Sequence, residues 1–280
     1  MKPPPFDYIR VESSDEAVDL LAEYGDEAKI IAGGQSLMPM LNMRLVRPQV
    51  LIDIAQTSDL RGITKKGKAI EIGATTTQAD LGSWSDLSLT LPLLASAIPS
   101  IGHFQTRNRG TVCGSLCHAD PSSELPACLM LLGGEVELKN KKGTRRVKAD
   151  DFLIGVLTTA KQDEELAIKA IYPVAQDGAK YAFTEFHHRH GDFAVVGIAG
   201  MVVDNKIRIA VGGVADRPEV REWQSLEGSA IDDALNDFAW ELRGSDDIHA
   251  TAQHRRELVR HLGRQVIDNL HVQKNYELSQ

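Results

Sequence analysis

The residues best suited to bind a ligand follow a short apolar run near the N-terminus. This segment reads Ile30-Ile-Ala-Gly-Gly-Gln-Ser-Leu37, so the apolar run ends in two glycines, a glutamine and a serine. Glycines let the backbone approach a ligand closely, and successive N–H groups in such a turn suit the oxygens of a diphosphate. The other interpretation is an ordinary strand-to-helix turn capped by Ser36. The segment alone favours that turn, because short glycine turns are common.

A second segment, rich in small and hydroxyl residues, extends from residue 106 to residue 124. It reads Thr106-Arg-Asn-Arg-Gly-Thr-Val-Cys-Gly-Ser-Leu-Cys-His-Ala-Asp-Pro-Ser-Ser-Glu124 and leads into an apolar helix. Its composition is too polar for a core strand and too rich in glycine for a helix, and two such turns could hold one ligand between them. Asp120 and Glu124 have a simpler interpretation as acids favoured by the dipole at a helix N-terminus.

Other motifs do not identify a catalytic centre. Gly62 to Ala69 matches most of a phosphate-binding P-loop, but Ala69 stands where a Ser or Thr should hold magnesium, and the segment joins two strands. We interpret it as a solvated hairpin turn. The chain has no G-x-G-x-x-G, H-E-x-x-H or G-x-S-x-G motif, so we expect no catalytic side chain.

Histidines gather in the segment Phe186-His-His-Arg-His-Gly-Asp-Phe193. At strand spacing His188 and His190 face one way, whereas His187 and Arg189 face the other. No cysteine accompanies them, and the pattern matches no metal-binding motif. We therefore expect surface or interface histidines rather than a metal site.

The three cysteines are Cys113, Cys117 and Cys128, and the first two are spaced C-x3-C. They are too few for a four-cysteine zinc or iron–sulfur site. An odd number of cysteines in a chain of this length is typical of free thiols in a reducing compartment. We expect small, reduced, buried residues and no metal.

The composition excludes several classes of protein. The chain has 280 residues, with 31 Lys and Arg against 39 Asp and Glu, so its formal net charge of −8 is opposite to that of a nucleic-acid binder. Its apolar runs are far short of the roughly 18 residues of a membrane span, and its start does not resemble a signal peptide. We expect a cytoplasmic protein without membrane insertion. An acidic chain that binds phosphates must use local backbone N–H groups.

The spacing of apolar residues and the capping motifs predict a mixture of helices and strands, and so an α+β chain, around these segments. Helices are expected after the capping residue Ser13 and after Thr75-Thr76-Thr77. Pro173 and Gly178 mark a domain boundary near residues 173–180. The remaining predictions are strands at 28–32, 50–54, 166–172, 181–187, 194–203 and 207–211, hairpins at 63–72 and 134–147, and helices at 36–45, 231–242 and 253–270.

Taken together, the motifs resemble the FAD-binding medium subunit of the molybdenum hydroxylases, the xanthine dehydrogenase family that includes carbon monoxide, quinoline and nicotinate dehydrogenases. The matching segments run in order over nearly the whole chain. They are Ala32-Gly-Gly-Gln-Ser-Leu37, Ile72-Gly-Ala-Thr-Thr76, Arg107-Asn-Arg-Gly-Thr-Val-Cys-Gly-Ser-Leu116, His118-Ala-Asp-Pro-Ser-Ser-Glu-Leu-Pro126 and Arg189-His-Gly-Asp-Phe-Ala194.

The resemblance implies a two-subdomain FAD-binding fold of the PCMH type, followed by a C-terminal three-stranded sheet with helices. The corresponding ranges are residues 1–56, 57–175 and 176–280. FAD would lie non-covalently between the first two. Cys113 departs from the Gly-Gly of many relatives, and Thr184 stands where xanthine dehydrogenases carry a lysine.

The same resemblance implies which residues bind FAD. The first turn and the strand before it would bind the diphosphate, through Ile30, Ile31, Ala32, Gly33, Gly34, Gln35, Ser36 and Leu37. The second loop would bind it from the other side, through Thr111, Gly114 and Ser115. Ile101 would lie against the cofactor, His118, Asp120 and Glu124 near its hydroxyls, Leu166 at the adenine and Phe193 beside the isoalloxazine.

The resemblance further implies one subunit of a heterotrimer that pairs into a dimer of heterotrimers. A large molybdopterin subunit would hydroxylate the substrate with oxygen from water. A small subunit with two [2Fe-2S] clusters would pass electrons to the FAD, which delivers them to an external acceptor. Molybdopterin and clusters would belong only to the partners.

Two alternatives stay open. The chain could be a self-sufficient FAD oxidoreductase of the same superfamily, with His103 or Cys113 tethering the flavin. It could also be a non-enzymatic adaptor whose glycine turns are only structural. The substrate and the electron acceptor are not encoded in these residues.

Overall fold

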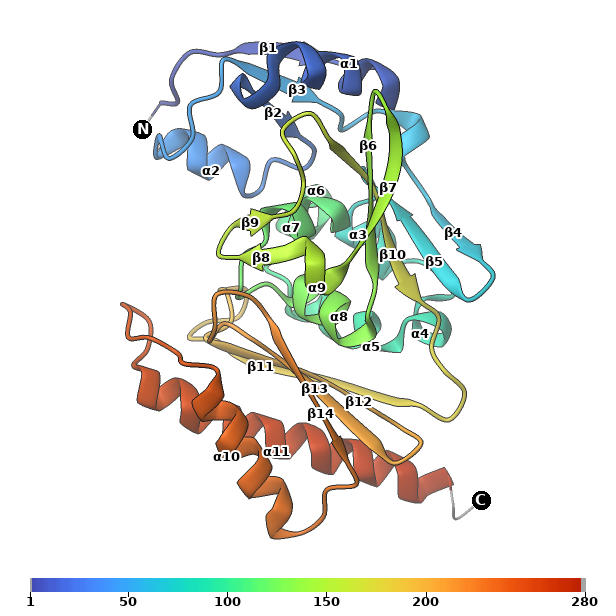
Figure 1. Cartoon of the computed structure of the whole chain (residues 1–280), viewed down its shortest axis with the longest axis vertical. Coiled ribbons are helices and arrows are strands. Elements are labelled where there is room, and N and C mark those ends of the chain that lie inside the picture. The colour runs from blue at the N-terminus through green and yellow to red at the C-terminus, as the bar shows by residue number, and fades with distance from the viewer. Residues whose placement is uncertain (1, 278–280) are drawn as a thin grey trace.

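The structure, a computed structural model, describes residues 2–277, with side chains to residue 272, and is built on three main sheets (Figure 1). The first is parallel, with the order β1 (Asp7–Arg10), β3 (Val50–Asp53), β2 (Ala28–Ile31). Helix α1 (Ser14–Tyr24) packs on it. Its cap is the one expected, because the Ser13 hydroxyl accepts a hydrogen bond from the Glu16 N–H at 3.2 Å.

The second sheet is antiparallel and confirms both expected hairpins. Its order is β4 (Ile63–Lys66), β5 (Ala69–Gly73), β10 (Leu166–Pro173), β6 (Glu135–Asn140), β7 (Gly143–Lys148). The P-loop-like segment, residues 62–69, comprises β4, the turn after it and the first residue of β5, and so belongs to a hairpin, as expected. One face carries ion pairs around Glu71, whose carboxylate lies 3.0 Å from both Lys66 Nζ and Lys169 Nζ. The other face is buried beneath helices.

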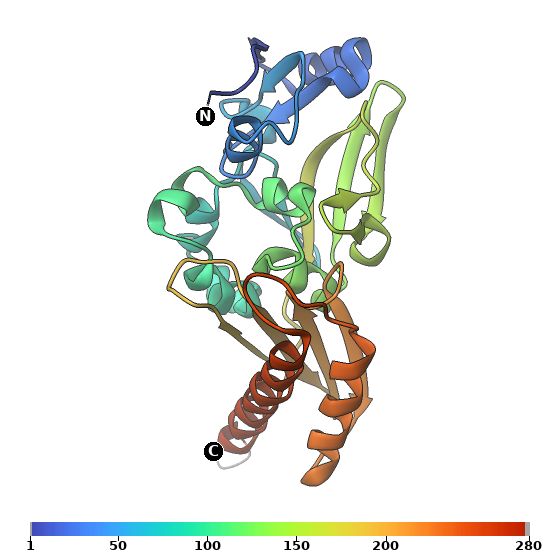
Figure 2. The same ribbon diagram turned by 90° about the vertical axis from the view of Figure 1, so that its left-hand side faces the viewer.

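Those helices lie between the second and third sheets in both views (Figures 1 and 2). Thr77 caps the first of them in a capping box with Asp80. A small hairpin beside them is tied to the end of α7 by a hydrogen bond from the Leu157 N–H to the Ala119 carbonyl. The elements are α3 (Gln78–Gly82), α4 (Leu87–Thr90), α5 (Pro92–Ala97), α6 (Phe104–Arg109), α7 (Val112–His118), α8 (Glu124–Leu132), α9 (Ala149–Phe152), β8 (Leu153–Gly155) and β9 (Thr158–Thr159).

The third sheet is an antiparallel meander between two layers of helices. Its strands are β11 (Lys180–Phe186), β12 (Val196–Val203), β13 (Lys206–Gly212) and β14 (Glu219–Gln224). Helices α10 (Ser229–Glu241) and α11 (Ala252–Glu277) cover one face, as Figure 2 shows. Helices α5 and α8, from the helical layer between the second and third sheets, also contact this sheet. This contact joins the third sheet to the helices that border the candidate site.

The α+β class is confirmed, but two local expectations are wrong and one strand was not predicted. The third sheet has four strands instead of three, because the exposed, charged segment 219–224 pairs with β13 as an edge strand. The segment 106–118 is largely helical, in α6 and α7, because each helix is short, Gly110 is the C-cap of α6, and Gly114 lies in the first turn of α7. Strand β1 is an unexpected third member of the first sheet.

No helix among residues 2–277 is long and apolar enough to cross a membrane.

The packing of α11 on the third sheet can be tested at Gly200. A Cβ at this position would lie 3.0 Å from Ile209 Cδ1 and closer still to Val266 of α11. Because both neighbours are buried, we expect Gly200→Ala to lower the free energy of unfolding by about 1–3 kcal/mol through overpacking. Urea unfolding would measure this loss. The control is Gly155→Ala, where a Cβ meets nothing within 4 Å; an equal loss in both variants would contradict the argument.

Candidate functional site

The first glycine turn leaves its backbone donors unused. After β2 ends at Ile31, Gly34 adopts a left-handed conformation with φ of 72°. Among the described residues, the N–H groups from Gly33 to Ser36 donate no hydrogen bond. The Ser36 hydroxyl does not cap α2 (Leu37–Asn42), so the ordinary serine-capped turn is not what forms here. The turn therefore presents consecutive free donors, as an anion site requires.

The second loop is held by its own cap. Thr111 is the N-cap of α7, and its Oγ1 accepts a hydrogen bond from the Gly114 N–H at 3.0 Å. A Cβ on Gly114 would lie 2.7 Å from this oxygen, so a side chain there would disturb the cap. The Cys113 sulfur lies 3.7 Å from the Ile72 carbonyl oxygen in the core. Ser115 follows with a hydroxyl that has no partner in the described part of the chain.

The two loops touch through their backbones at Gly33. A Cβ on Gly33 would lie 2.8 Å from Gly110 Cα and would overlap the Arg109 carbonyl. Gly110 is itself fixed, because its carbonyl accepts a hydrogen bond from the Gln78 N–H at 2.8 Å. The two glycines thus differ in function: Gly33 allows the loops to meet, and Gly34 allows the left-handed turn.

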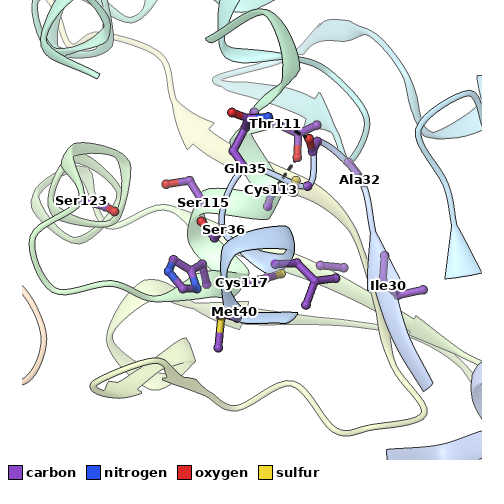
Figure 3. A pocket seen from close by; sticks show the side chains of 18 of the residues that line it. Ile30, Ala32, Gln35, Ser36, Met40, Thr111, Cys113, Ser115, Cys117 and Ser123 are labelled. Carbon is purple, nitrogen blue, oxygen red and sulfur yellow. Dashed lines mark hydrogen bonds between the residues drawn. The ribbon is translucent and has the colours of Figure 1, made fainter. Parts of the chain in front are cut away.

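A cavity of about 680 Å³ opens beside this contact, within the usual range for a small-molecule or cofactor site. Figure 3 shows side chains of both loops around it, among them Gln35, Ser36, Thr111 and Ser115. The structure brings together all but two of the residues expected at the site. They are Ile30, Ala32, Gly33, Gly34, Gln35, Ser36, Leu37, Ile101, Thr111, Gly114, Ser115, His118, Glu124, Leu166 and Phe193.

Ile31 and Asp120 do not line the cavity. The Ile31 side chain packs behind the turn, 3.3 Å from where a Gly34 Cβ would lie. Asp120 Oδ1 accepts a hydrogen bond from the Ser122 N–H at 2.9 Å and so shapes the turn before α8. Thr184, where xanthine dehydrogenases are expected to carry lysine, pairs with Ile198 in the third sheet and is not a lining residue.

Two lysines also line the cavity, although the sequence analysis expected backbone donors alone. Lys161 Nζ donates hydrogen bonds to the carbonyls of Gln162 and Glu165, at 2.9 and 3.1 Å, and burial lowers its pKa. Lys29 Nζ lies 3.6 Å from Asp163. Lys29 lies on β2, directly before the glycine turn, and this position could have indicated a lysine at the site. Lys161 lies in a loop without any motif.

Burial also perturbs an acid and a histidine that line the cavity. Burial raises the pKa of Glu124 to about 7, so this carboxyl is partly protonated at neutral pH and can donate a hydrogen bond. Burial lowers the pKa of His118, so its imidazole is neutral there and both accepts and donates. Both groups therefore suit the hydroxyl groups of a ligand better than its phosphates.

The cysteines are free thiols, and burial raises the pKa of each of them. Cys113 and Cys128 are buried, whereas Cys117 is only half-buried and lines the cavity. The pKa of Cys117 is about 11, so its thiol stays protonated at neutral pH. Among the described residues, no group of three or more His, Cys, Asp or Glu side chains is placed to hold a metal ion.

The expected arrangement of the histidine segment is wrong. Strand β11 ends at Phe186, so the following residues do not alternate. The rings of His187 and His190 instead approach each other, with centroids 6.1 Å apart. The loop continues past Gly191, which packs against the His103 ring, to Phe193 at the cavity, where 62% of this residue is exposed.

The donor set fits an elongated dinucleotide such as FAD. Consecutive free N–H groups and serine hydroxyls suit the diphosphate, and the glycines leave room for it. Buried Ile101 and Leu166 supply apolar walls, and exposed Phe193 supplies an aromatic ring at the rim. A flavin dinucleotide needs each of these environments within one cavity.

Comparisons with known proteins agree with this fit. The family model "FAD binding domain in molybdopterin dehydrogenase" matches residues 4–175. The 6-hydroxypseudooxynicotine dehydrogenase complex subunit alpha of Paenarthrobacter nicotinovorans is 38% identical, covering 93% of this chain and 92% of the relative. The carbon monoxide dehydrogenase medium chain of Hydrogenophaga pseudoflava is 37% identical, covering 79% of each chain.

Among solved structures, a carbon monoxide dehydrogenase from Hydrogenophaga pseudoflava that lacks the Mo-pyranopterin moiety of its molybdenum cofactor superimposes with a TM-score of 0.92. The sequence identity is 30%, and the match covers 97% of this chain and 99% of the solved one.

The contact at Gly33 makes a sharp test of the site. We expect Gly33→Ala to separate the two loops, because the added Cβ meets rigid backbone, and to yield protein with little bound flavin. Absorbance near about 450 nm per mole of purified protein would measure the flavin. Gly34→Val, which forces a branched residue into a left-handed turn, should also lose flavin.

The matched control is Ala69→Ser, in the β4–β5 hairpin that resembles a P-loop. This variant should keep the full flavin content. Wild-type flavin content in both glycine variants would exclude the diphosphate role of this turn.

Proposed function

The chain belongs to the family of FAD-binding domains of molybdopterin dehydrogenases, and from this premise we propose that it is the FAD-carrying electron-transfer subunit of a heterotrimeric molybdenum hydroxylase. The observation that carries the proposal is the run of free N–H groups from Gly33 to Ser36, closed by the Thr111 loop over one cavity. The relatives' names, which include "medium chain" and "complex subunit alpha", support a place in a multi-subunit enzyme.

The chain's own residues bind and orient the cofactor. We propose that the N–H groups of the first turn and the Ser36 and Ser115 hydroxyls hold the diphosphate, with Lys29 and Lys161 adding positive charge to the cavity. His118 and Glu124 meet the hydroxyl groups, Leu166 packs on the adenine, and Phe193 lies beside the isoalloxazine. When bound, FAD supplies reversible storage of two electrons.

No side chain of this chain is needed as acid, base or nucleophile in the hydroxylation. We propose that a large partner holds molybdopterin and hydroxylates the substrate, and that a small partner carries the [2Fe-2S] clusters that pass electrons to this subunit. Two heterotrimers would pair in the full enzyme. The free thiols support a reducing, cytoplasmic location.

We also propose the division of the chain at residues 1–56, 57–175 and 176–280. Its support is that each of the three main sheets lies within one of these ranges. The cavity is lined from all three, because Phe193 reaches it from the last.

A self-sufficient FAD oxidoreductase is less well supported. The relatives that match most of this chain are subunits or medium chains by name. A covalent tether also finds little support, because the Cys113 sulfur faces the Ile72 carbonyl and the His103 ring packs on Gly191.

Affinity purification of the tagged chain from its native host tests the assignment. We expect two further chains to co-purify in equal amounts, together with molybdenum and iron, and FAD to be released by acid. Flavin that stays attached after acid denaturation would contradict non-covalent binding. A colourless protein that does not take up added FAD would instead favour the structural adaptor.

Phe193 provides a test of access to the flavin. Because its ring stands exposed at the rim of the cavity, we expect Phe193→Ala to change the rate of flavin reoxidation several-fold while leaving the FAD content nearly unchanged. Stopped-flow absorbance would measure the rate. Phe104→Ala is the matched control, since Phe104 is 63% exposed but does not line the cavity. Loss of FAD without a change in rate would reverse the assignment.

A further inference from the structure

A carboxyl group without a hydrogen-bond partner is buried on strand β11 of the third sheet. The side chain of Glu185, on β11, is only 3% exposed, and neither of its oxygens has a hydrogen-bond partner in the described part of the chain. An ionisable neighbour is His187, whose Nε2 lies 3.9 Å from Glu185 Oε1. The Nδ1 of His187 is also buried and unpartnered. A polar cluster of this kind is costly to bury, so it calls for an explanation.

Glu124 is the second member of the cluster. It lines the cavity at the start of α8, is 7% exposed, and forms no ion pair among the described residues. Burial raises the pKa of Glu124 to about 7. Burial, with the charge of Glu124 added, raises the pKa of Glu185 to about 8. Two interacting carboxyls that are both buried titrate as one unit and keep protons near neutral pH.

The other groups around the pair do not neutralise it. Asp120, before α8, adds negative charge near Glu124, and His118 on α7 faces Asp120. Cys128 on α8 and Tyr172 on β10 are buried, and burial raises the pKa of both, so they stay uncharged at neutral pH. Helix α5 and strand β12, which also contact β11, contain no titratable residue. Helix α11 also contacts β11, where its His254 ring packs on Phe186.

Histidines connect the pair to solvent. The ring of His187 lies 6.1 Å from that of His190, which is exposed and in turn lies 5.9 Å from that of His103. A neutral imidazole carries one hydrogen-bond donor and one acceptor, so it can pass a proton on to a neighbouring group. The cluster therefore extends from the wall of the cavity, at Glu124, to the surface at His190.

We propose that Glu124 and Glu185 form a proton-uptake site, reached from solvent through His187, that takes up a proton whenever the cofactor in the adjoining cavity gains electrons. The inference rests on the proposed function, in which the electrons come from iron–sulfur clusters that deliver no protons. Added electrons make the cavity more negative. One carboxylate of the pair then forms an O–H bond with a proton from solvent, and this bond breaks when the electrons leave.

The charge balance favours this use of the pair. In a medium of low dielectric constant, an added negative charge raises the pKa of nearby carboxyls, and a pair poised between about 7 and about 8 responds most strongly at physiological pH. A carboxyl with an ordinary pKa would stay ionised in both redox states. A purely structural pair would not change its protonation with the flavin.

Infrared spectroscopy tests the carboxyl pair directly. In the purified subunit we expect a protonated-carboxyl C=O band that disappears as the pH is raised from about 6 to about 9. Glu185→Gln should lose the part of this band that titrates near 8 and keep the part from Glu124, and Glu185→Asp should restore some of the lost part. Glu222→Gln, an exposed carboxyl of the same sheet paired with Lys206, is the matched control and should leave the band unchanged. The absence of a titrating band in the wild type would overturn the proposal, whether or not FAD is bound.

Proton uptake tests the coupling to the flavin. Reduction of the FAD-loaded subunit in weakly buffered, anaerobic solution with a pH indicator should take up more protons per flavin near pH 8 in the wild type than in Glu185→Gln. Equal uptake in the two proteins, with normal flavin content, would overturn the inference and leave the proposed function intact. A wild-type chain that binds no FAD would instead overturn the proposed function.

Thermal unfolding of the same variants gives a third readout. Because both carboxyls have a pKa above the ordinary 4.5, their contribution to stability is complete below that value and is lost as the pH rises through about 7 and about 8. The melting temperature should therefore fall less between about pH 6 and about pH 9 in Glu185→Gln than in the wild type. An identical fall would contradict the burial of an ionisable Glu185.

Discussion

The close approach of two backbones at Gly33 is the constraint on which the site depends. The glycine turn after β2 meets the connection between α6 and α7 at Arg109 and Gly110, with no side chain between the two backbones. Hydrogen bonds on both sides keep that connection in place, from Gln78 to Gly110 and from Gly114 to Thr111. The cavity exists because these two loops are held together while the N–H groups beside the contact stay free.

The candidate site presents hydrogen-bond donors and positive charge, although the chain as a whole is negatively charged. A protein with a formal net charge of −8 does not attract a diphosphate, so donors must be concentrated locally. Free N–H groups and two lysines provide them. The acids that line the cavity would repel a diphosphate. Burial leaves Glu124 partly protonated at neutral pH, whereas Asp163 and Glu165 are paired with Lys29 and Arg145. The same low-dielectric wall that suits an apolar ring thus limits the negative charge beside an anionic ligand.

Features encoded within one segment could be predicted from the sequence, and features that join distant segments could not. The strand, glycine turn and helix of residues 28–42 follow from local pattern, and so do the Ser13 and Thr77 caps. Strand β14 could not be predicted because it is an edge strand that pairs only with β13, and its charged residues lack the apolar pattern of a strand. Lys161 and the Glu124–Glu185 pair have no local signature. Glu124 and Glu185 come together only because α8 packs on the third sheet. No sequence motif near either residue predicts that contact.

The position of β10 bears on how the molecule is made. This strand is the centre of the second sheet, between β5 and β6, yet it is the last of the five to be synthesised. Until residue 173 has left the ribosome, the hairpins β4–β5 and β6–β7 have no partner to join them and expose unpaired edges. Leu166 arrives with the same strand, so a wall of the cavity is missing until then. Cofactor loading is consequently a late event in biogenesis, and a nascent chain truncated before β10 is a target for aggregation rather than a partial flavoprotein.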